Sequence, residues 1–427
     1  MLGNVVFFIL FIILAIELFK NLKKGIIKYI VFALVSPHLN IGDFQISFEI
    51  FSFFLVLVVV LIKDSSVFLI YRKYLYRQHL MIYFIVFILA SLLAVIRFGS
   101  EIPWISFIAI FRVVCLIYML QYVMKDSPEE TIDQIISPIL FINLAVSIIQ
   151  ITVPASTRLF YEFYYKTSLT PLEAVLKLGY FDRGYGTFGT PVLLGVFSLL
   201  SFAVYFGFFV ERKNFKRKYL KLISSIIIGL LALSKTAIIG IPSILVLCCI
   251  LSFLGVIKVK NRKVLLLPLI VIPIFGITVR LLERQGTAIT WYLSFLRNPF
   301  KAFETRYDTT SGILANTYST ITSNWMLGVG GTPLANDFIG DSMYTGIIYS
   351  TGVLGLFIYF SALIISTIKN LKFRNATALL CFVVICLTGF GAPIQLHIIS
   401  VPLLAYMFSK SEEVINKEHK LGTNNKL

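Results

Sequence analysis

The chain has 427 residues, of which 58% are hydrophobic and only 14% are charged, with a mean hydropathy of +0.89. Soluble domains carry about 25% charged residues, so a water-soluble fold could not hide this much apolar surface. A membrane β-barrel would alternate apolar and polar residues, whereas residues 53–62 (FFLVLVVVLI) are uniformly apolar. The composition predicts an all-α polytopic membrane protein, with residues 1–427 forming a single integral membrane domain.

The hydropathy pattern predicts thirteen membrane-spanning helices. Several of these segments are shorter than the roughly 20 residues that a spanning helix needs. The predicted segments are residues 5–19, 26–41, 44–62, 80–96, 103–124, 135–153, 191–209, 219–234, 237–257, 264–279, 343–368, 376–390 and 396–408.

The net charge is +17. The positions of the basic residues along the chain indicate membrane topology and not a nucleic-acid-binding surface. Most of the 38 lysine and arginine residues fall in one alternating set of loops, including 212–221, 258–263 and the tail 410–427. Basic short loops lie on the cytoplasmic side. The N-terminus is therefore predicted outside, the C-terminus inside, and no nucleic-acid partner is expected.

Two long segments, residues 154–190 and 280–342, are predicted on the extracytoplasmic side. The other connections on that side are short and carry almost no charge. Because a site needs a loop large enough to build it, any extracytoplasmic chemistry is expected in these two loops.

The first long loop ends in an arginine followed by a glycine-rich turn, Arg183 to Pro191, which includes Gly186 and Gly189. A proline opens the next helix, so free backbone N–H groups and the positive end of the helix dipole could bind an oxyanion or phosphate. The alternative is a purely structural turn, with Arg183 reaching toward lipid headgroups.

Lys235 lies in the short outer connection Ser234-Lys235-Thr236. A lysine in so short an outer loop runs against the charge bias of the other connections, which suggests a function such as substrate binding. A single lysine reaching to the headgroups is the alternative explanation.

The second long loop carries arginines and carboxylates. Arg280 and Arg284 open it, Arg306 follows, and a turn containing Gly328 and Gly330 comes next. Asp341 and Tyr344 then stand where the following helix begins. Such a set supplies an acid–base group and anion-binding cations. Arg297 and Lys301 lie among aromatic residues, as in a helix at the membrane surface.

Other signals are weaker. Glu49 and Arg112 fall within predicted helices, and a structural ion pair between them is expected. The sequence has no P-loop, HExxH motif, GxSxG elbow or CxxC pair. No metal site and no cofactor are therefore predicted.

The outer motifs, in this order, resemble those of Wzy-type polymerases of O-antigen and capsular polysaccharide. The resemblance rests on Arg183 with its glycine turn, Ser-Lys-Thr at 234–236, Arg306, the Gly328-Val329-Gly330 turn and Asp341-Ser342-x-Tyr344. It covers roughly residues 183–360. The related O-antigen ligases are less similar, because they usually place a histidine where this chain has Asp341.

The resemblance implies a metal-independent glycosyltransferase of the bacterial cytoplasmic membrane that uses a lipid-linked oligosaccharide. It implies transfer of the growing glycan from undecaprenyl pyrophosphate. Arginines aimed at the pyrophosphate would stabilise its developing charge. An acceptor hydroxyl needs a base, and Asp341 is expected in this role because it stands at the mouth of a helix facing the loop, ahead of Glu173, Asp182 and Asp337. A flippase and a chain-length regulator are the implied partner proteins. An O-antigen ligase and a flippase or transporter for lipid-linked sugars are the alternative functions.

The predicted topology can be tested with reporter fusions. We expect fusions at Asp182 and Asp308 to report an extracytoplasmic location, and fusions at Lys216 and Lys372 a cytoplasmic one, because the basic loops stay inside. Alkaline phosphatase and fluorescent-protein fusions measure the two sides independently. If Asp182 and Asp308 lie on opposite sides, the two long loops cannot build one site.

Overall fold

The computed structural model describes residues 2–41, 44–69, 75–153, 156–164, 183–213, 215–260, 266–283, 300, 304, 306–331, 334 and 342–424. The described part of the chain is about 80% helical, which confirms the prediction of a mainly α-helical protein. Seven of the described helices are long and apolar enough to cross a membrane. The full count of thirteen crossings and the sides of the loops stay predictions.

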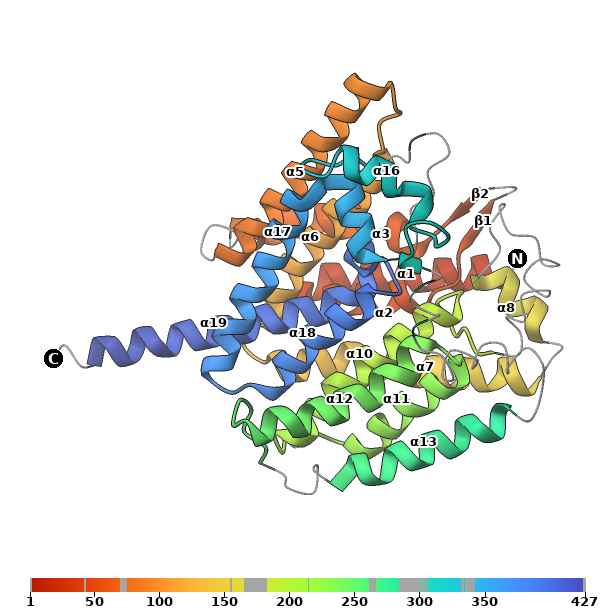
Figure 1. Cartoon of the computed structure of the whole chain (residues 1–427), viewed down its shortest axis with the longest axis vertical. Coiled ribbons are helices and arrows are strands. Elements are labelled where there is room, and N and C mark those ends of the chain that lie inside the picture. The colour runs from red at the N-terminus through yellow and green to blue at the C-terminus, as the bar shows by residue number, and fades with distance from the viewer. Residues whose placement is uncertain are drawn as a thin grey trace.

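The elements follow one another around a helical bundle (Figure 1). The N-terminal half contains α1 (Leu2–Lys20), α2 (Leu22–Val35), β1 (Leu39–Ile41), β2 (Phe44–Ile46), α3 (Phe48–Asp64), α4 (Ser66–Leu69), α5 (Leu75–Phe98), α6 (Trp104–Met124), α7 (Pro128–Thr152) and α8 (Thr157–Tyr164). The C-terminal half contains α10 (Pro191–Val210), α11 (Lys218–Ala232), α12 (Lys235–Phe253), α13 (Leu267–Glu283), α16 (Ala315–Ser323), α17 (Met343–Lys372), α18 (Ala376–Gly389), the 3-10 turns η6 (Ile394–Leu396) and η7 (Ile398–Ser400), and α19 (Val401–Asn424).

The second predicted helix, residues 26–41, extends too far. Helix α2 ends at Val35, and the chain then forms a short antiparallel hairpin in which Leu39 pairs with Ile46. Pro37 explains the end of the helix, because a proline disfavours helical geometry in the residue before it and lacks an N–H group. The third helix correspondingly begins at Phe48 and not at residue 44.

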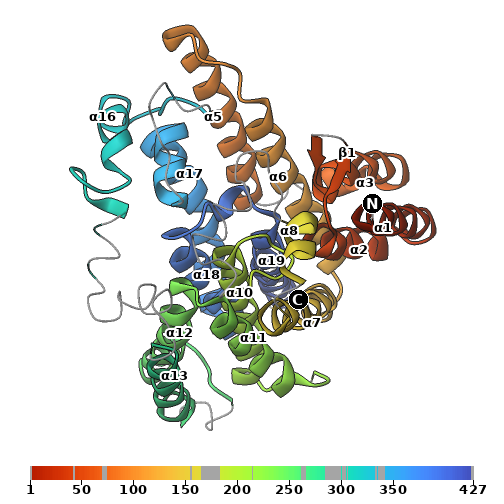
Figure 2. The same ribbon diagram turned by 90° about the vertical axis from the view of Figure 1, so that its right-hand side faces the viewer.

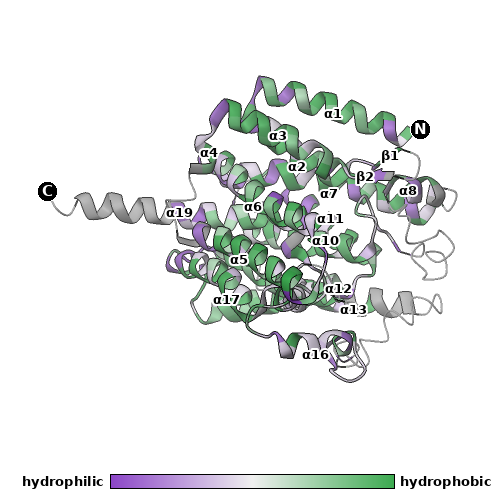
Figure 3. Cartoon of the chain, turned by 90° about the horizontal axis from the view of Figure 1, so that it is seen from above, coloured by the Kyte–Doolittle hydropathy of each residue, from purple (hydrophilic) through white to green (hydrophobic). Residues whose placement is uncertain are grey.

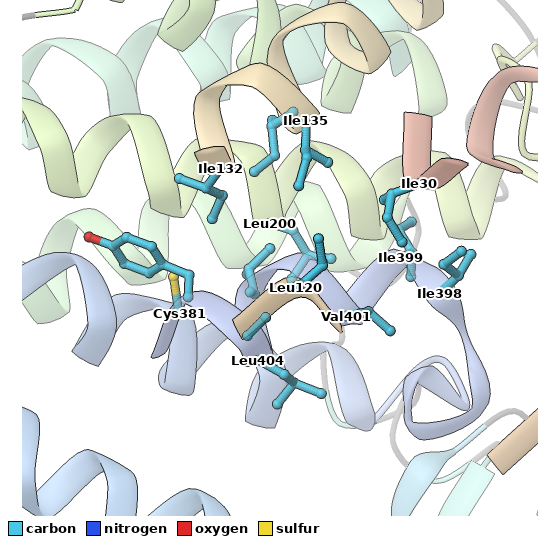
Figure 4. Packing of buried hydrophobic residues seen from close by; sticks show 14 of the residues in the cluster. Ile30, Leu120, Ile132, Ile135, Leu200, Cys381, Ile398, Ile399, Val401 and Leu404 are labelled. Carbon is cyan, nitrogen blue, oxygen red and sulfur yellow. The ribbon is translucent and has the colours of Figure 1, made fainter. Parts of the chain in front are cut away.

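Helix α10 forms the centre of the bundle and packs on α11, α12 and α18 (Figure 2). Its side chains are buried along almost the whole length, including Leu200, which lies among residues of α6, α7 and α19 (Figure 4). The outer helices instead expose apolar side chains, for example Ile16, Ile96 and Phe357, and hydrophobic residues run along α1, α3 and α5 (Figure 3). This apolar surface requires lipid around it.

Glu49 and Arg112 form the expected ion pair, with 2.6 Å between Oε1 and Nη2. Both side chains are largely buried between α3 and α6. The pair therefore compensates two charges inside the membrane domain, and the prediction of a structural ion pair is confirmed.

Helix α17 is interrupted at Gly352, whose backbone has φ 65° and ψ −169°. The interruption takes four backbone groups out of the regular helical pattern, and residues 325–330, which we call the glycine strap, bind them. Val329 and Gly330 donate N–H groups to the carbonyls of Tyr349 and Ser350, at 2.8 and 3.0 Å. In return, Val353 and Leu354 donate to the carbonyls of the strap at 2.8 and 3.3 Å.

The backbone geometry of this contact requires glycine at two positions. A Cβ atom at Gly352 would collide with the carbonyl of Met326, and one at Gly328 would collide with the backbone of Ser350. Gly328 and Gly352 also have positive φ angles, which side chains rarely adopt. The Gly328–Gly330 turn was predicted to bind substrate. In this structure it supplies hydrogen-bond partners to the backbone groups at the break in α17.

We expect Gly352→Ala to destabilise the protein. Alanine must adopt a backbone region that is almost exclusive to glycine, at a cost of about 1–3 kcal/mol, and its Cβ collides with the strap. The thermal unfolding temperature of the purified protein in detergent measures the effect. Gly276→Ala in α13 is the control, because nothing lies within 4 Å of its Cβ position. Equal unfolding temperatures for the two variants would contradict this account of the break.

Candidate functional site

Three cations from distant parts of the sequence gather at one end of the bundle. Arg183 precedes α10, Lys235 opens α12, and Arg306 belongs to the second long loop. The positive charges of Arg306 and Arg183 both act on the ammonium group of Lys235. Because like charges repel, the cluster favours an anionic ligand.

Arg183 is buried, with 4% of its surface exposed, and it binds the end of a neighbouring helix. Its Nε donates to the carbonyl of Ala232 at 3.0 Å, and its Nη2 donates to the carbonyl of Leu233 at 3.3 Å. The N–H of Gly184 donates to the carbonyl of Leu231 at 2.8 Å. The Arg183–Gly184 segment therefore caps the C-terminus of α11, where a positive charge is favourable.

The glycine turn does not offer the free N–H groups that we expected from the sequence. The N–H groups of Tyr185 and Gly186 donate to Oε1 of Gln150 at 3.0 and 2.9 Å. The N–H of Thr187 donates to Oδ1 of Asn143 at 2.8 Å. These amide side chains come from α7 and already occupy the donors, so the expectation of an oxyanion pocket here is corrected.

Glycine is required at position 186, because φ is +58° and a Cβ atom would collide with Asn143. Gly189, with φ +72°, lies just before α10. Thr190 then caps the helix by accepting the N–H of Leu193 at 3.3 Å, and Pro191 takes the first helical position as predicted. The turn connects Arg183 to the central helix in one fixed geometry.

Lys235 and Arg306 line a cleft between α12 and α18, with about 760 Å³ of open space. We call it the cationic cleft. Its lining includes the described residues Lys235, Ile239, Arg306, Tyr307, Leu387 and Phe390.

The cationic cleft is amphipathic. Lys235, which is exposed, and Arg306 supply positive charge at its head. Ile239 and Leu387 make the adjoining walls apolar, and Ile239 keeps 46% of its surface exposed on the outside of the bundle. A ligand with an anionic head and a hydrocarbon chain matches both parts, because the chain can leave the cleft toward lipid.

Tyr307, for which the sequence predicted no role, also lines this cleft. Its hydroxyl is 2.8 Å from Oγ of Ser342 and 2.8 Å from the carbonyl of Phe390. Ser342 Oγ accepts in the contact with Tyr307 and donates its own proton to the carbonyl of Gly389 at 3.2 Å. Burial raises the pKa of Tyr307, so its hydroxyl keeps its proton at neutral pH. Its position directly after Arg306 was the signal in the sequence.

Of the other predicted site residues, Tyr344 lies next to the cationic cleft. Tyr344 donates from its hydroxyl to the carbonyl of Cys386 at 2.7 Å and packs on Phe390, with 4.7 Å between ring centroids. It therefore supports the wall of the cationic cleft. Arg280 lies in the last turn of α13, but its side chain is outside the described part, as are Arg284 and Asp341.

The chain matches the sequence model of no known protein family, and no curated protein matches it significantly. A functional assignment therefore depends on the sequence motifs and on the geometry of the cationic cleft.

We expect Arg183→Ala to lower stability, and not activity alone, because Arg183 caps α11. Hydrogen bonds to charged groups contribute about 1.5–3 kcal/mol, and alanine leaves the two carbonyls without this donor. Unfolding of the purified protein in mixed detergent micelles measures the loss. Arg97→Ala is a control, since Arg97 is exposed and packs only on the ring of Phe98 among the contacts described. Equal stabilities would contradict the capping role.

Proposed function

We propose that this chain is a polysaccharide polymerase of the Wzy type. It would transfer a growing glycan from undecaprenyl pyrophosphate to a hydroxyl of a new lipid-linked repeat unit, at the outer face of a bacterial cytoplasmic membrane. The observation that carries this proposal is the cationic cleft, where Lys235 and Arg306 stand at the head of apolar walls between α12 and α18. The ordered outer motifs support the same assignment.

The chemistry follows from the charge of the leaving group. As the acceptor oxygen bonds to the anomeric carbon, the bond from that carbon to the pyrophosphate oxygen breaks, and its electron pair leaves with the pyrophosphate. Arg306 can donate paired hydrogen bonds to these oxygens, while Lys235 adds a compact positive charge. Both groups favour the transition state because negative charge increases on the leaving oxygen.

The acceptor hydroxyl must lose its proton during the transfer. We propose Asp341 as the base, with Glu173, Asp182 and Asp337 as alternatives, all outside the described residues. Asp341 directly precedes Ser342, which contacts Tyr307 beside Arg306. A carboxylate at this place in the sequence can accept the proton.

We propose thirteen membrane crossings, with the N-terminus outside and the C-terminus in the cytoplasm. The lysines assigned to the cytoplasmic side support a shared location, because several of them meet near the start of α7. Lys213 and Lys410 both pair with Glu129, and Lys221 pairs with Asp133 at 2.6 Å. A flippase that supplies the repeat units and a chain-length regulator are the proposed partner proteins.

A second candidate function is transport of lipid-linked sugars. The interruption of α17 at Gly352 favours it, since carriers use broken helices near their binding sites. The glycine strap, however, already binds the backbone groups next to this break. Incubation of the purified protein with lipid-linked repeat units separates the two functions, because a polymerase lengthens the glycan and a transporter does not.

We expect Arg306→Ala and Lys235→Ala to slow glycan elongation strongly. Loss of one preorganised donor to a developing anion costs about 10²–10³ in rate, and lysine at position 306 should restore only part of it. Gel separation of the glycans made by the purified protein measures the rate.

The matched control is Arg97→Ala, which removes one positive charge from an exposed residue outside the cleft. Its elongation rate should stay near that of the wild type. If Arg306→Ala and Lys235→Ala elongate normally at equal protein levels, the cationic cleft is not the pyrophosphate site.

A further inference from the structure

A second cleft lies beside the cationic one, between α5, α6, α17 and η6, with about 610 Å³ of open space. We call it the neutral cleft, because none of the described residues that line it is charged. Its lining combines hydroxyl, amide and aromatic groups, chiefly Tyr83, Phe87, Ser106, Ser342, Ser350 and Gln395.

Shared residues connect the two clefts. Arg306 and Tyr307 line the cationic cleft and also a smaller adjoining pocket. Ser342 lines this smaller pocket and the neutral cleft as well. The hydrogen-bonded pair of Tyr307 and Ser342 therefore stands at the junction, with the cations on one side and the uncharged groups on the other.

Gln395 indicates that the neutral cleft is built for a polar ligand. Only 6% of its surface is exposed, and among the described residues its Oε1 atom has no hydrogen-bond partner. Buried amide oxygens are nearly always hydrogen-bonded, and those that are not call for a functional explanation. A hydroxyl group of a ligand in the cleft would donate to this atom.

The chemistry of the lining selects the class of ligand. A pyrophosphate lacks a cation here, since the described lining has none. A hydrocarbon chain would leave the buried Oε1 of Gln395 without water or any other hydrogen-bond donor. A saccharide satisfies both conditions, because it is uncharged or weakly charged, carries many hydroxyls and can pack against Tyr83 and Phe87.

We propose that the neutral cleft binds the acceptor saccharide, which deepens the proposed polymerase function and rests on it. The acceptor lies along α5 and α17, and its reacting hydroxyl reaches the Tyr307–Ser342 junction. The donor pyrophosphate lies on the other side of that junction, with Lys235 and Arg306. Gln395 is then a specificity-determining residue for the repeat unit.

The test uses the full-length protein in lipid nanodiscs and two separate probes. One probe is undecaprenyl pyrophosphate without sugar. The other is the free repeat-unit saccharide, released by mild acid from the lipid-linked intermediates of host cells that lack this protein. Binding of each probe is measured by calorimetry, so the donor and acceptor sites are read independently.

We expect Gln395→Ala and Ser106→Trp to weaken saccharide binding about tenfold or more and to leave undecaprenyl pyrophosphate binding unchanged. The first removes one buried hydrogen bond, and the second fills the cleft. Ile105→Trp is the matched control, because its neighbour Ser106 lines the cleft while Ile105 is 82% exposed on the outside. Arg306→Ala should show the opposite pattern.

Saccharide binding that is absent in the wild type, or unchanged in Gln395→Ala and Ser106→Trp, overturns the assignment of the neutral cleft. Ser106→Trp keeps the test decisive if Gln395→Ala does not fold, and an unchanged unfolding temperature identifies the folded variants. Undecaprenyl pyrophosphate binding that does not depend on Arg306 would instead contradict the proposed function. The two failures are therefore distinguishable.

Discussion

The site depends on one constraint, which is that backbone polar groups inside a membrane domain must find partners within the protein. The break of α17 at Gly352 disturbs the helical hydrogen bonds on both sides, and the glycine strap, residues 325–330, binds the groups at the break. This contact attaches the second long loop to the core. The break itself separates the first nine residues of α17 from the rest of the helix. These nine residues begin beside Tyr307 and Ser342.

Electrostatics imposes the second requirement. Arg183, Lys235 and Arg306 are brought together at one end of the bundle, although like charges repel. Arg183 is held by the C-terminal carbonyls of α11, whose partial negative charge favours a guanidinium. Lys235 and Arg306 face the cationic cleft. One cation thus serves the structure, while the other two are in position for an anionic ligand.

The junction of Tyr307 and Ser342 gives the two clefts different chemistry within a short distance. A group transfer needs its donor and acceptor aligned and close, which converts a bimolecular reaction into an effectively unimolecular one. The charged cleft would select an amphipathic anion, and the uncharged polar cleft would select a saccharide. This selection needs no conformational change. The ring of Phe390, packed on Tyr344, stabilises the wall between α17 and α18.

The sequence by itself determined the class of the protein. Long apolar runs must be helices surrounded by lipid, and a described helix overlaps each predicted segment. The exceptions within these segments are the hairpin after Pro37 and the 3-10 turns that precede Val401. Local chemistry also predicted the helix start at Pro191 and, from the cost of isolated charges, the Glu49–Arg112 pair. Only the tertiary structure decided which side chains meet. The partners of Arg183 lie about 50 residues away, and the amides that occupy the glycine turn come from α7. Such contacts depend on how helices pack, because neighbours in space need not be neighbours along the chain.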